Sequence, residues 1–467
     1  MTVGGAWRRR GALLAGRAAG GAARTLGRGG GTALPGLVAG AIAPDLLESV
    51  LAQLGHGVLT VTGTNGKTTT THLLAAIARA SGLRALTNRS GSNLERGLVS
   101  ACIDATDGRG MLTQPTERVG LLEVDEAAWP VLLPRLRPGA AVFLNLFRDQ
   151  LDRYGEVDSV AEGWRRALAA YAQPLTLVLN ADDPAVAQLA EAARGPVIAF
   201  GVDDDAVALP GAEHATDARF CGCGAAFAYE AIYMGHVGRW RCPGCGRARP
   251  PLDVCARHVE LGAEQTRFEL HAQGRVLHVQ HALAGLYSVY DALAAAAGAL
   301  ALGLPLEAVG RALDEAGPAF GRQERFTLAH CRARLLLAKN PTGLNEVVRT
   351  LAATAEPVTL LLMLNDGIQD GRDVSWIYDA DLERLRGRVR TLVVGGTRAH
   401  DMALRCVLAG VEPAAVVEAS AAALDEALAR TPAGGRLDIV ATYTAMLDVR
   451  AELAKRARSG AYWEERV

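Results

Sequence analysis

No run of apolar residues in this sequence is long enough to span a lipid bilayer, which takes about 20 residues as a helix. Neither sign of charge is in excess: 49 Lys and Arg stand against 50 Asp and Glu, and the pI is about 6.8. The balance argues against an overall basic surface of the kind that binds nucleic acids. The sequence also has no internal repeat, and no cysteine sits in a glycine turn with a histidine partner, as a nucleophilic cysteine would.

The composition and the first residues bound the class of protein. With 467 residues, 50% of them hydrophobic and 21% charged, the chain suits two or three globular domains. Residues 1–25 carry Arg8-Arg9-Arg10 and then Gly/Ala-rich sequence. Because Arg17 and Arg24 interrupt that apolar block, a signal peptide is disfavoured. We expect an amphipathic or a disordered N-terminal extension over residues 1–45.

Short β-branched segments alternate with Ala/Leu-rich segments over residues 50–300, which predicts a parallel sheet covered by helices on both faces. The strand candidates are residues 58–61, 119–123, 141–144 and 175–179. Each is followed at once by polar residues. Ligands of such sheets bind beyond the carboxyl ends of the strands, so we expect the site there.

The alternation predicts two α/β domains. The first covers residues 46–316 and includes a helix near 289–303, but residues 202–280 break the rhythm and indicate an inserted β-rich module. Gly317-Pro318-Ala319-Phe320-Gly321 is a plausible boundary. The second domain covers residues 317–467, with strands expected near 335–338, 358–364, 391–394 and 437–441.

The most informative segment is Gly63-Thr64-Asn65-Gly66-Lys67-Thr68-Thr69, which follows the first strand and precedes a helical pattern. Glycines let backbone N–H groups approach phosphate oxygens, and a helix N-terminus adds positive potential. Lys67 can reach terminal phosphates, and the Thr68 hydroxyl can bind magnesium. The G-x-x-G-K-T spacing is two residues shorter than the general phosphate loop. An ordinary glycine-rich turn is the alternative.

The strand at 119–123 ends in carboxylates. Glu123 and Glu126 follow its apolar residues and, beside a phosphate loop, are placed to hold magnesium directly or through water. Acidic residues also follow strands as helix caps, so this signal depends on the loop.

Four of the eight cysteines lie between residues 221 and 245. Cys221-x-Cys223 and Cys242-x-x-Cys245 have the spacing of two zinc knuckles, and four thiolates close a tetrahedral structural site. Chance clustering or a disulfide pair is the alternative. The other four cysteines are scattered and predicted to be buried thiols, as expected for a reducing cytoplasm.

Five aspartates, at positions 366, 370, 373, 379 and 381, surround Trp376. They are either a solvated acidic turn or a carboxylate cluster that can orient a histidine of another chain. The histidines of this chain show no spacing typical of metal ligands.

Several segments together carry a resemblance to a known family. They are the phosphate loop and residues 27–36, 148–154, 320–325, 339–341, 370–376 and 443–447. The set resembles the Mur ligases and folylpolyglutamate synthases, and most of all the MurT-like ligases, over almost the whole chain.

The resemblance implies a Mur-ligase-like α/β fold: a parallel-sheet ATP-binding domain with a zinc ribbon inserted at about 215–252, then a second α/β domain of MurT type. It implies a carbon–nitrogen ligase that uses ATP and Mg²⁺, with a structural Zn²⁺. The reaction is amidation of the D-glutamate α-carboxylate of the lipid II stem peptide to D-isoglutamine through an acyl phosphate. A GatD-like glutamine amidotransferase would supply ammonia within a heterodimer, in the cytoplasm at the inner face of the membrane.

The resemblance also implies roles for particular residues. ATP-binding residues are Gly63, Thr64, Asn65, Gly66, Lys67, Thr68, Thr69 and Arg322. In this family an aspartate of the last domain completes the glutaminase site of the partner. We favour Asp373, then Asp370, because each sits beside the glycine turn.

The sequence departs from the family pattern in three ways. Gln150 stands where Mur ligases have a histidine that helps to hold a second magnesium, and residues 160–166 lack the carbamylated lysine of many members. Ser288 and Asp291 stand where the family usually has asparagines that contact adenine.

Two other functions compete with this interpretation. A stand-alone Mur or folylpolyglutamate-type ligase would join an amino acid without a second subunit. A zinc-ribbon binding module that uses nucleotide as a switch would bind nucleic acid with steep salt dependence; the balanced charge argues against it.

Overall fold

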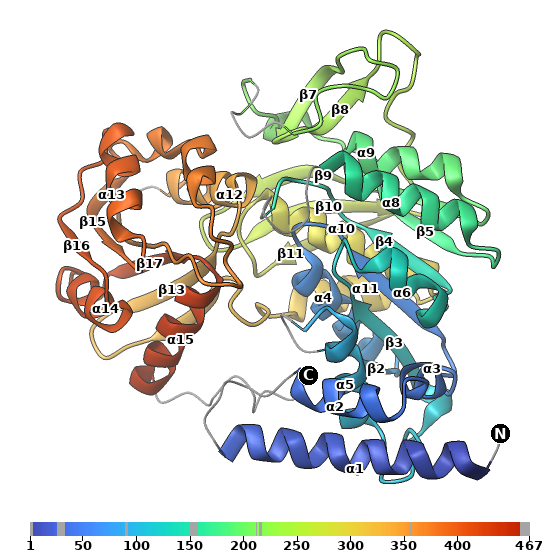
Figure 1. The fold of residues 1–467 in the computed structure, drawn as a ribbon. Helices are drawn as coiled ribbons and strands as arrows, with labels where there is room; N and C mark the ends of the chain where they lie inside the picture. The colour runs from blue at the N-terminus through green and yellow to red at the C-terminus, as the bar shows by residue number, and fades with distance from the viewer. Residues whose placement is uncertain are drawn as a thin grey trace.

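The computed structural model describes residues 3–25, 33–88, 92–149, 157–211, 213, 217–354 and 356–457. Within these residues two α/β units lie side by side, and a small hairpin projects from the first (Figure 1). No helix among the described residues is long and apolar enough to cross a membrane.

The first unit is a nine-stranded sheet in the order β11-β10-β9-β6-β5-β4-β1-β3-β2. Its strands are parallel from β2 to β9, and β10 and β11 continue it in antiparallel fashion. The strands are β1 (Val58–Thr62), β2 (Arg84–Leu86), β3 (Arg118–Glu123), β4 (Ala140–Phe143), β5 (Thr176–Asn180), β6 (Val197–Val202), β9 (Val254–Leu261), β10 (Thr266–Ala272) and β11 (Arg275–His281). The helices of this unit are α3 (Leu46–Leu51), α4 (Lys67–Ala80), α5 (Glu95–Ala105), α6 (Trp129–Leu136), α8 (Val157–Ala170), α9 (Pro184–Ala187), α10 (Leu286–Ala301) and α11 (Leu306–Glu315).

The period-two alternation of the strands builds a core on each face of this sheet. In β4, Val142 joins the core under α4 and α10, whereas Phe143 faces the opposite core. There Phe143 contacts Trp129 of α6 and Trp164 of α8 edge to face, with ring centroids 4.9 Å apart in both pairs. The predicted doubly covered parallel sheet is therefore confirmed.

The second unit is a six-stranded sheet in the order β12-β13-β17-β14-β15-β16. All its pairs are parallel except β12 with β13. Its elements are β12 (Glu324–Thr327), β13 (Arg332–Leu337), α12 (Pro341–Ala352), β14 (Val358–Met363), β15 (Val389–Gly395), α13 (Ala399–Leu408), β16 (Ala415–Val417), α14 (Ser420–Ala429), β17 (Arg436–Ala441) and α15 (Tyr443–Ala457). All four strands expected here, and all four expected in the first sheet, are present within a few residues.

The β-rich region after β6 is smaller than the sequence suggests. Only β7 (Ala228–Met234) and β8 (Val237–Arg241) form a separate hairpin, while residues 254–281 belong to the edge of the main sheet. An antiparallel meander has the same alternating pattern in either place, so the sequence could not tell them apart. Trp240 anchors the hairpin through a 3.0 Å hydrogen bond from its Nε1 to the carbonyl of Ala181, just after β5.

The N-terminal segment forms two helices, α1 (Val3–Thr25) and α2 (Leu34–Ile42). Helix α1 packs on α2, and α2 packs on α5. Helix α2 approaches α5 closely enough to require glycine at position 36, since a Cβ at Gly36 would lie 1.8 Å from the carbonyl oxygen of Arg96. Of the two alternatives for this segment, the described residues favour the amphipathic helix.

A buried ion pair links two adjacent strands of the second sheet, and we expect it to matter for stability. Arg334 on β13 donates to Asp438 on β17 at 2.7 Å, and both side chains are almost fully buried. Asp438→Ala should lower the free energy of unfolding by about 3–5 kcal/mol, because it leaves the buried guanidinium of Arg334 without a carboxylate partner. Chemical denaturation measures this.

The matched control is Asp425→Ala, which breaks an exposed pair with Arg456. That change should cost less than about 1 kcal/mol. If both variants lost the same free energy of unfolding, the buried Arg334–Asp438 pair would not have the special importance for stability that we assign to it.

Candidate active site

The phosphate-loop segment occupies the turn from β1 into α4, at the carboxyl edge of the first sheet. Gly63 and Gly66 have φ angles of 136° and 91°, which favour glycine. A Cβ at Gly66 would lie 2.1 Å from Oδ1 of Asp291 on α10. The glycines are thus needed both for the turn and for its close packing.

The tip of β4 holds the loop in place through Asn145. Its carbonyl accepts from the Thr64 N–H at 2.9 Å, and its side-chain Oδ1 accepts from the Asn65 N–H at 2.9 Å. The Asn145 amide in turn donates to the Asn65 carbonyl at 3.1 Å. Asn145 directly follows the strand predicted at residues 141–144, but no sequence pattern identified this positioning role.

Carboxylates at the end of β3 and just after it face the loop. Lys67 Nζ lies 2.9 Å from Glu126 Oε2, and Thr68 donates its hydroxyl hydrogen to Glu123 Oε2 at 2.9 Å. Burial disfavours the charge of Lys67, but Glu126 and Glu123 outweigh it and raise the lysine pKa. Despite burial, Lys67 and Lys339 hold the pKa of Glu126 below its usual range. Lys67 and Glu126 therefore form a charged pair.

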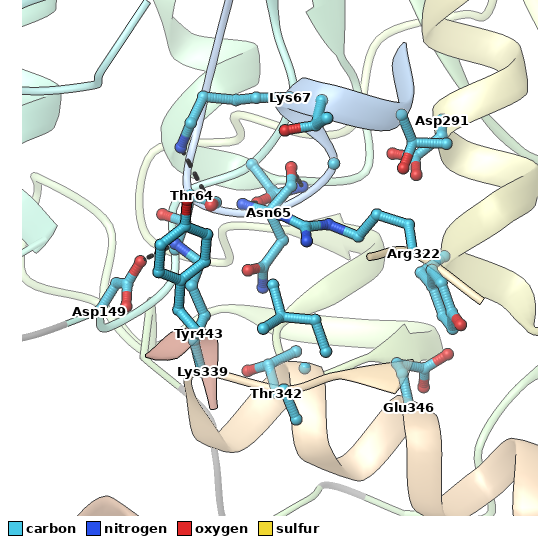
Figure 2. Close-up of a pocket in the computed structure, with 18 of the residues that line it drawn as sticks. Thr64, Asn65, Lys67, Asp149, Asp291, Arg322, Lys339, Thr342, Glu346 and Tyr443 are labelled. Carbon is cyan, nitrogen blue, oxygen red and sulfur yellow. Dashed lines mark hydrogen bonds and ion pairs between the residues drawn. The ribbon is translucent and has the colours of Figure 1, made fainter. Parts of the chain in front are cut away.

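The second α/β unit completes the site. Lys339, after β13, forms an ion pair with Asp149 of the first unit, which Figure 2 marks with a dashed line. Asn340 caps α12 and exchanges two hydrogen bonds with the Asn65 side chain, at 3.0 and 3.3 Å. The Lys-Asn-Pro motif carried the signal for these contacts, although no role was assigned to it from the sequence. Gln150 lies outside the described residues.

Arg322 and Asp291 lie on the other side of the loop (Figure 2). Burial raises the pKa of Asp291 to about 8, while Arg322 and the hydroxyls of Thr69 and Thr70 oppose that rise. The buried Nη1 atom of Arg322 has no hydrogen-bond partner. A guanidinium nitrogen of this kind is suited to an anion.

These groups surround one cavity of about 310 Å³. It is lined by the phosphate loop, Glu123, Glu126, Arg322, Lys339 and Tyr443, among other residues of both units. The predicted ATP and magnesium residues, far apart in sequence, are thus brought together in space.

The two candidate aspartates lie beside a smaller neighbouring cavity of about 60 Å³. Asp370 is buried and accepts from both the backbone N–H and the hydroxyl of Thr444. Asp373 is exposed, and Ser375 donates its N–H to it at 2.8 Å, which lowers the Asp373 pKa. Asp149 and Lys339 line both cavities. The aspartate segment therefore adjoins the larger cavity.

The four clustered cysteines converge at the end of the β7–β8 module. Their sulfur atoms all lie within 4.8 Å of one another, and the Cys221–Cys245 and Cys223–Cys242 sulfur distances are 3.6 and 3.4 Å. A disulfide would bring two sulfurs to about 2.05 Å. Tetrahedral zinc with bonds of about 2.3 Å separates them by about 3.8 Å, so the residues fit zinc, the short first knuckle included.

Both α/β units contain segments that match known protein families. Residues 61–222 match the family model of the Mur ligase middle domain, and residues 337–446 match that of the MurT ligase C-terminal domain. The chain is 32% identical to the MurT subunit of a Streptococcus pneumoniae lipid II isoglutaminyl synthase, over 95% of this chain and 96% of the relative. It is 31% identical to the corresponding Staphylococcus aureus subunit, over 85% of this chain and 87% of the relative.

Solved structures support the fold. A pseudomurein peptide ligase type C from Methanothermus fervidus is 20% identical with a TM-score of 0.64, covering 85% of this chain and 78% of that one. MurF from Acinetobacter baumannii is 20% identical with a TM-score of 0.63, covering 90% and 80%. The two matched domains and the full-length similarity show that this chain belongs to the MurT family of Mur-type ligases.

Proposed function

We propose that this chain is the ligase subunit of a lipid II isoglutaminyl synthase. It amidates the α-carboxylate of D-glutamate in the lipid II stem peptide, with ATP as energy source and ammonia from a separate GatD-like glutaminase. The observation that carries the proposal is the single cavity in which a Mur-type phosphate loop meets residues of the MurT-type C-terminal unit. The relatives with matching length are named as subunits of such a synthase.

The proposed chemistry is phosphoryl transfer followed by amide formation. The substrate carboxylate attacks the γ-phosphorus of ATP, and ADP leaves. Ammonia then attacks the acyl phosphate carbon, and inorganic phosphate leaves. The loop amides, Lys67 and Arg322 face the phosphates and stabilise charge on the transferring group. Thr68 and Glu123 would hold Mg²⁺, with Glu126 beside them; the ion would neutralise phosphate charge.

A stand-alone amino-acid ligase is the less favoured alternative, because the similarity to MurT subunits extends over nearly the whole chain. The discriminating experiment incubates the chain and its glutaminase with lipid II, ATP and glutamine, and weighs the product. Conversion of a carboxylate to a carboxamide, mapped by fragmentation to D-glutamate, is expected only when both subunits or free ammonium are present. Amino-acid addition without the glutaminase would overturn the proposal.

We place the reaction in the cytoplasm, at the inner membrane face.

The phosphate-loop lysine gives the first test. Lys67→Ala should reduce amidation at least about a hundredfold, since it removes a charge that contacts the transferring phosphoryl group. It also strips buried Glu126 of its partner. We therefore pair it with Lys67→Ala/Glu126→Gln, which should regain thermal stability but not activity. Near-wild-type amidation by either variant would exclude the assignment.

The cysteine cluster gives a second test. We expect one zinc per chain, bound by Cys221, Cys223, Cys242 and Cys245. Cys242→Ser should lose the metal and lower the melting temperature of the protein, because the metal supplies folding energy to the small module. Cys331→Ser, outside the cluster, should retain zinc. Elemental analysis that finds no zinc in the unmodified protein would refute the site.

The exposed aspartate gives a third test. Asp373→Asn should leave the complex assembled but reduce glutamine hydrolysis by about 10²–10⁴-fold, as loss of a histidine-orienting carboxylate does. Amidation from added ammonium should survive. Asp370, already bound to Thr444, is the second candidate, and Asp370→Asn is the matched variant. Normal hydrolysis by both would show that neither aspartate serves the partner.

A further inference from the structure

The N-terminal helix concentrates positive charge in a chain that is otherwise balanced. The first 44 residues contain six arginines and no acidic residue, although the formal net charge of the protein is −1. Arg8 and Arg9 contact Asp45, and the Arg10 guanidinium lies over the Trp7 ring at 5.6 Å. No element of the proposed ligase chemistry uses this charge.

The outer face of α1 is also apolar. Trp7 and Leu14 are 68% and 64% exposed, and their spacing of seven residues places them on the same side of the helix. Exposed Ala18 continues the stripe, and Arg10 flanks it. Amphipathic helices that combine exposed aromatic and leucine residues with arginine can lie in the interface of anionic membranes.

The opposite face of α1 fixes it to the nucleotide-binding unit. Ala12 and Leu13 are fully buried, and Arg17 donates to the carbonyl of Ile103 at 3.2 Å on α5. Helix α5 begins at the edge of the large cavity, where Arg96 is part of the wall. Figure 1 shows α1 along the outside of this unit, next to α2. Helix α5 therefore fixes the position of α1, and with it the outer face of α1, relative to the cavity.

We propose that the outer face of α1 docks on the surface of an anionic phospholipid bilayer. Trp7 and Leu14 enter the boundary between headgroups and acyl chains, and Arg10 lies toward the lipid phosphates. The excess of positive charge on this segment favours an anionic lipid surface over a protein partner, because charge attraction to phosphates adds to the small apolar area. The proposal rests on the proposed function in one respect: a lipid-linked substrate presents its peptide beside that surface.

Vesicle binding tests the surface without substrate or nucleotide. The full chain with its glutaminase should co-sediment with phosphatidylglycerol vesicles and bind phosphatidylcholine vesicles much more weakly, with binding reduced by salt. Arg10→Glu and Trp7→Ser/Leu14→Ser should each weaken binding at least about fivefold. Val131→Ser is the matched control, since Val131 is 74% exposed on α6 and should have no effect.

An activity measurement separates docking from catalysis. The Trp7→Ser/Leu14→Ser variant should amidate vesicle-embedded substrate more slowly than the unmodified protein, yet turn over a water-soluble stem peptide equally well. Equal binding to anionic and neutral vesicles would overturn the proposal. So would variants that change the oligomeric state or the glutaminase complex instead, because the face would then be a protein interface. Neither result bears on the amidation reaction itself.

Discussion

The site depends on one asparagine of the phosphate loop. The Asn65 backbone N–H binds Asn145 at the tip of β4, and the Asn65 side chain exchanges hydrogen bonds with Asn340 at the start of α12. A neutral amide both donates and accepts, so it joins two units without the cost of burying another charge. Through this residue the loop has a fixed position relative to the C-terminal unit, and Lys339 is brought to the nucleotide side of the interface.

The charges of the cavity are paired, one pair within the first unit and one across the interface. Lys67 is paired with Glu126, and Lys339 with Asp149. Buried charges without partners cost several kcal/mol each, and pairing avoids that cost. The phosphates of a bound nucleotide can replace the carboxylates as partners of the lysines, whereas Arg322 already has a free nitrogen for an anion. Binding of ATP would thus exchange one set of ion pairs for another.

The cysteine-bearing module is tied to both units. Arg349 of α12 donates to the carbonyls of Val207 and Tyr233, at 2.6 and 2.9 Å, and Arg384 of the second unit lies 3.3 Å from Glu213. The module therefore connects the nucleotide-binding unit to the C-terminal unit as well as extending the first. Its cysteines do not line the cavity.

The sequence by itself determined the two parallel sheets, the phosphate loop and the cysteine cluster, because each rests on local spacing: period-two strands, glycines before a helix, and paired knuckles. Only the tertiary structure decided which strands joined which sheet. Residues 254–281 form the edge of the main sheet, whereas the sequence predicted an inserted module over residues 202–280. It also decided that Asp370 is buried against Thr444 while Asp373 is exposed. Asn145 and Asn340 became recognisable as positioning residues only in space, since they lie 80 and 275 residues from Asn65. Contacts at such separations depend on how whole units pack, which no local pattern records.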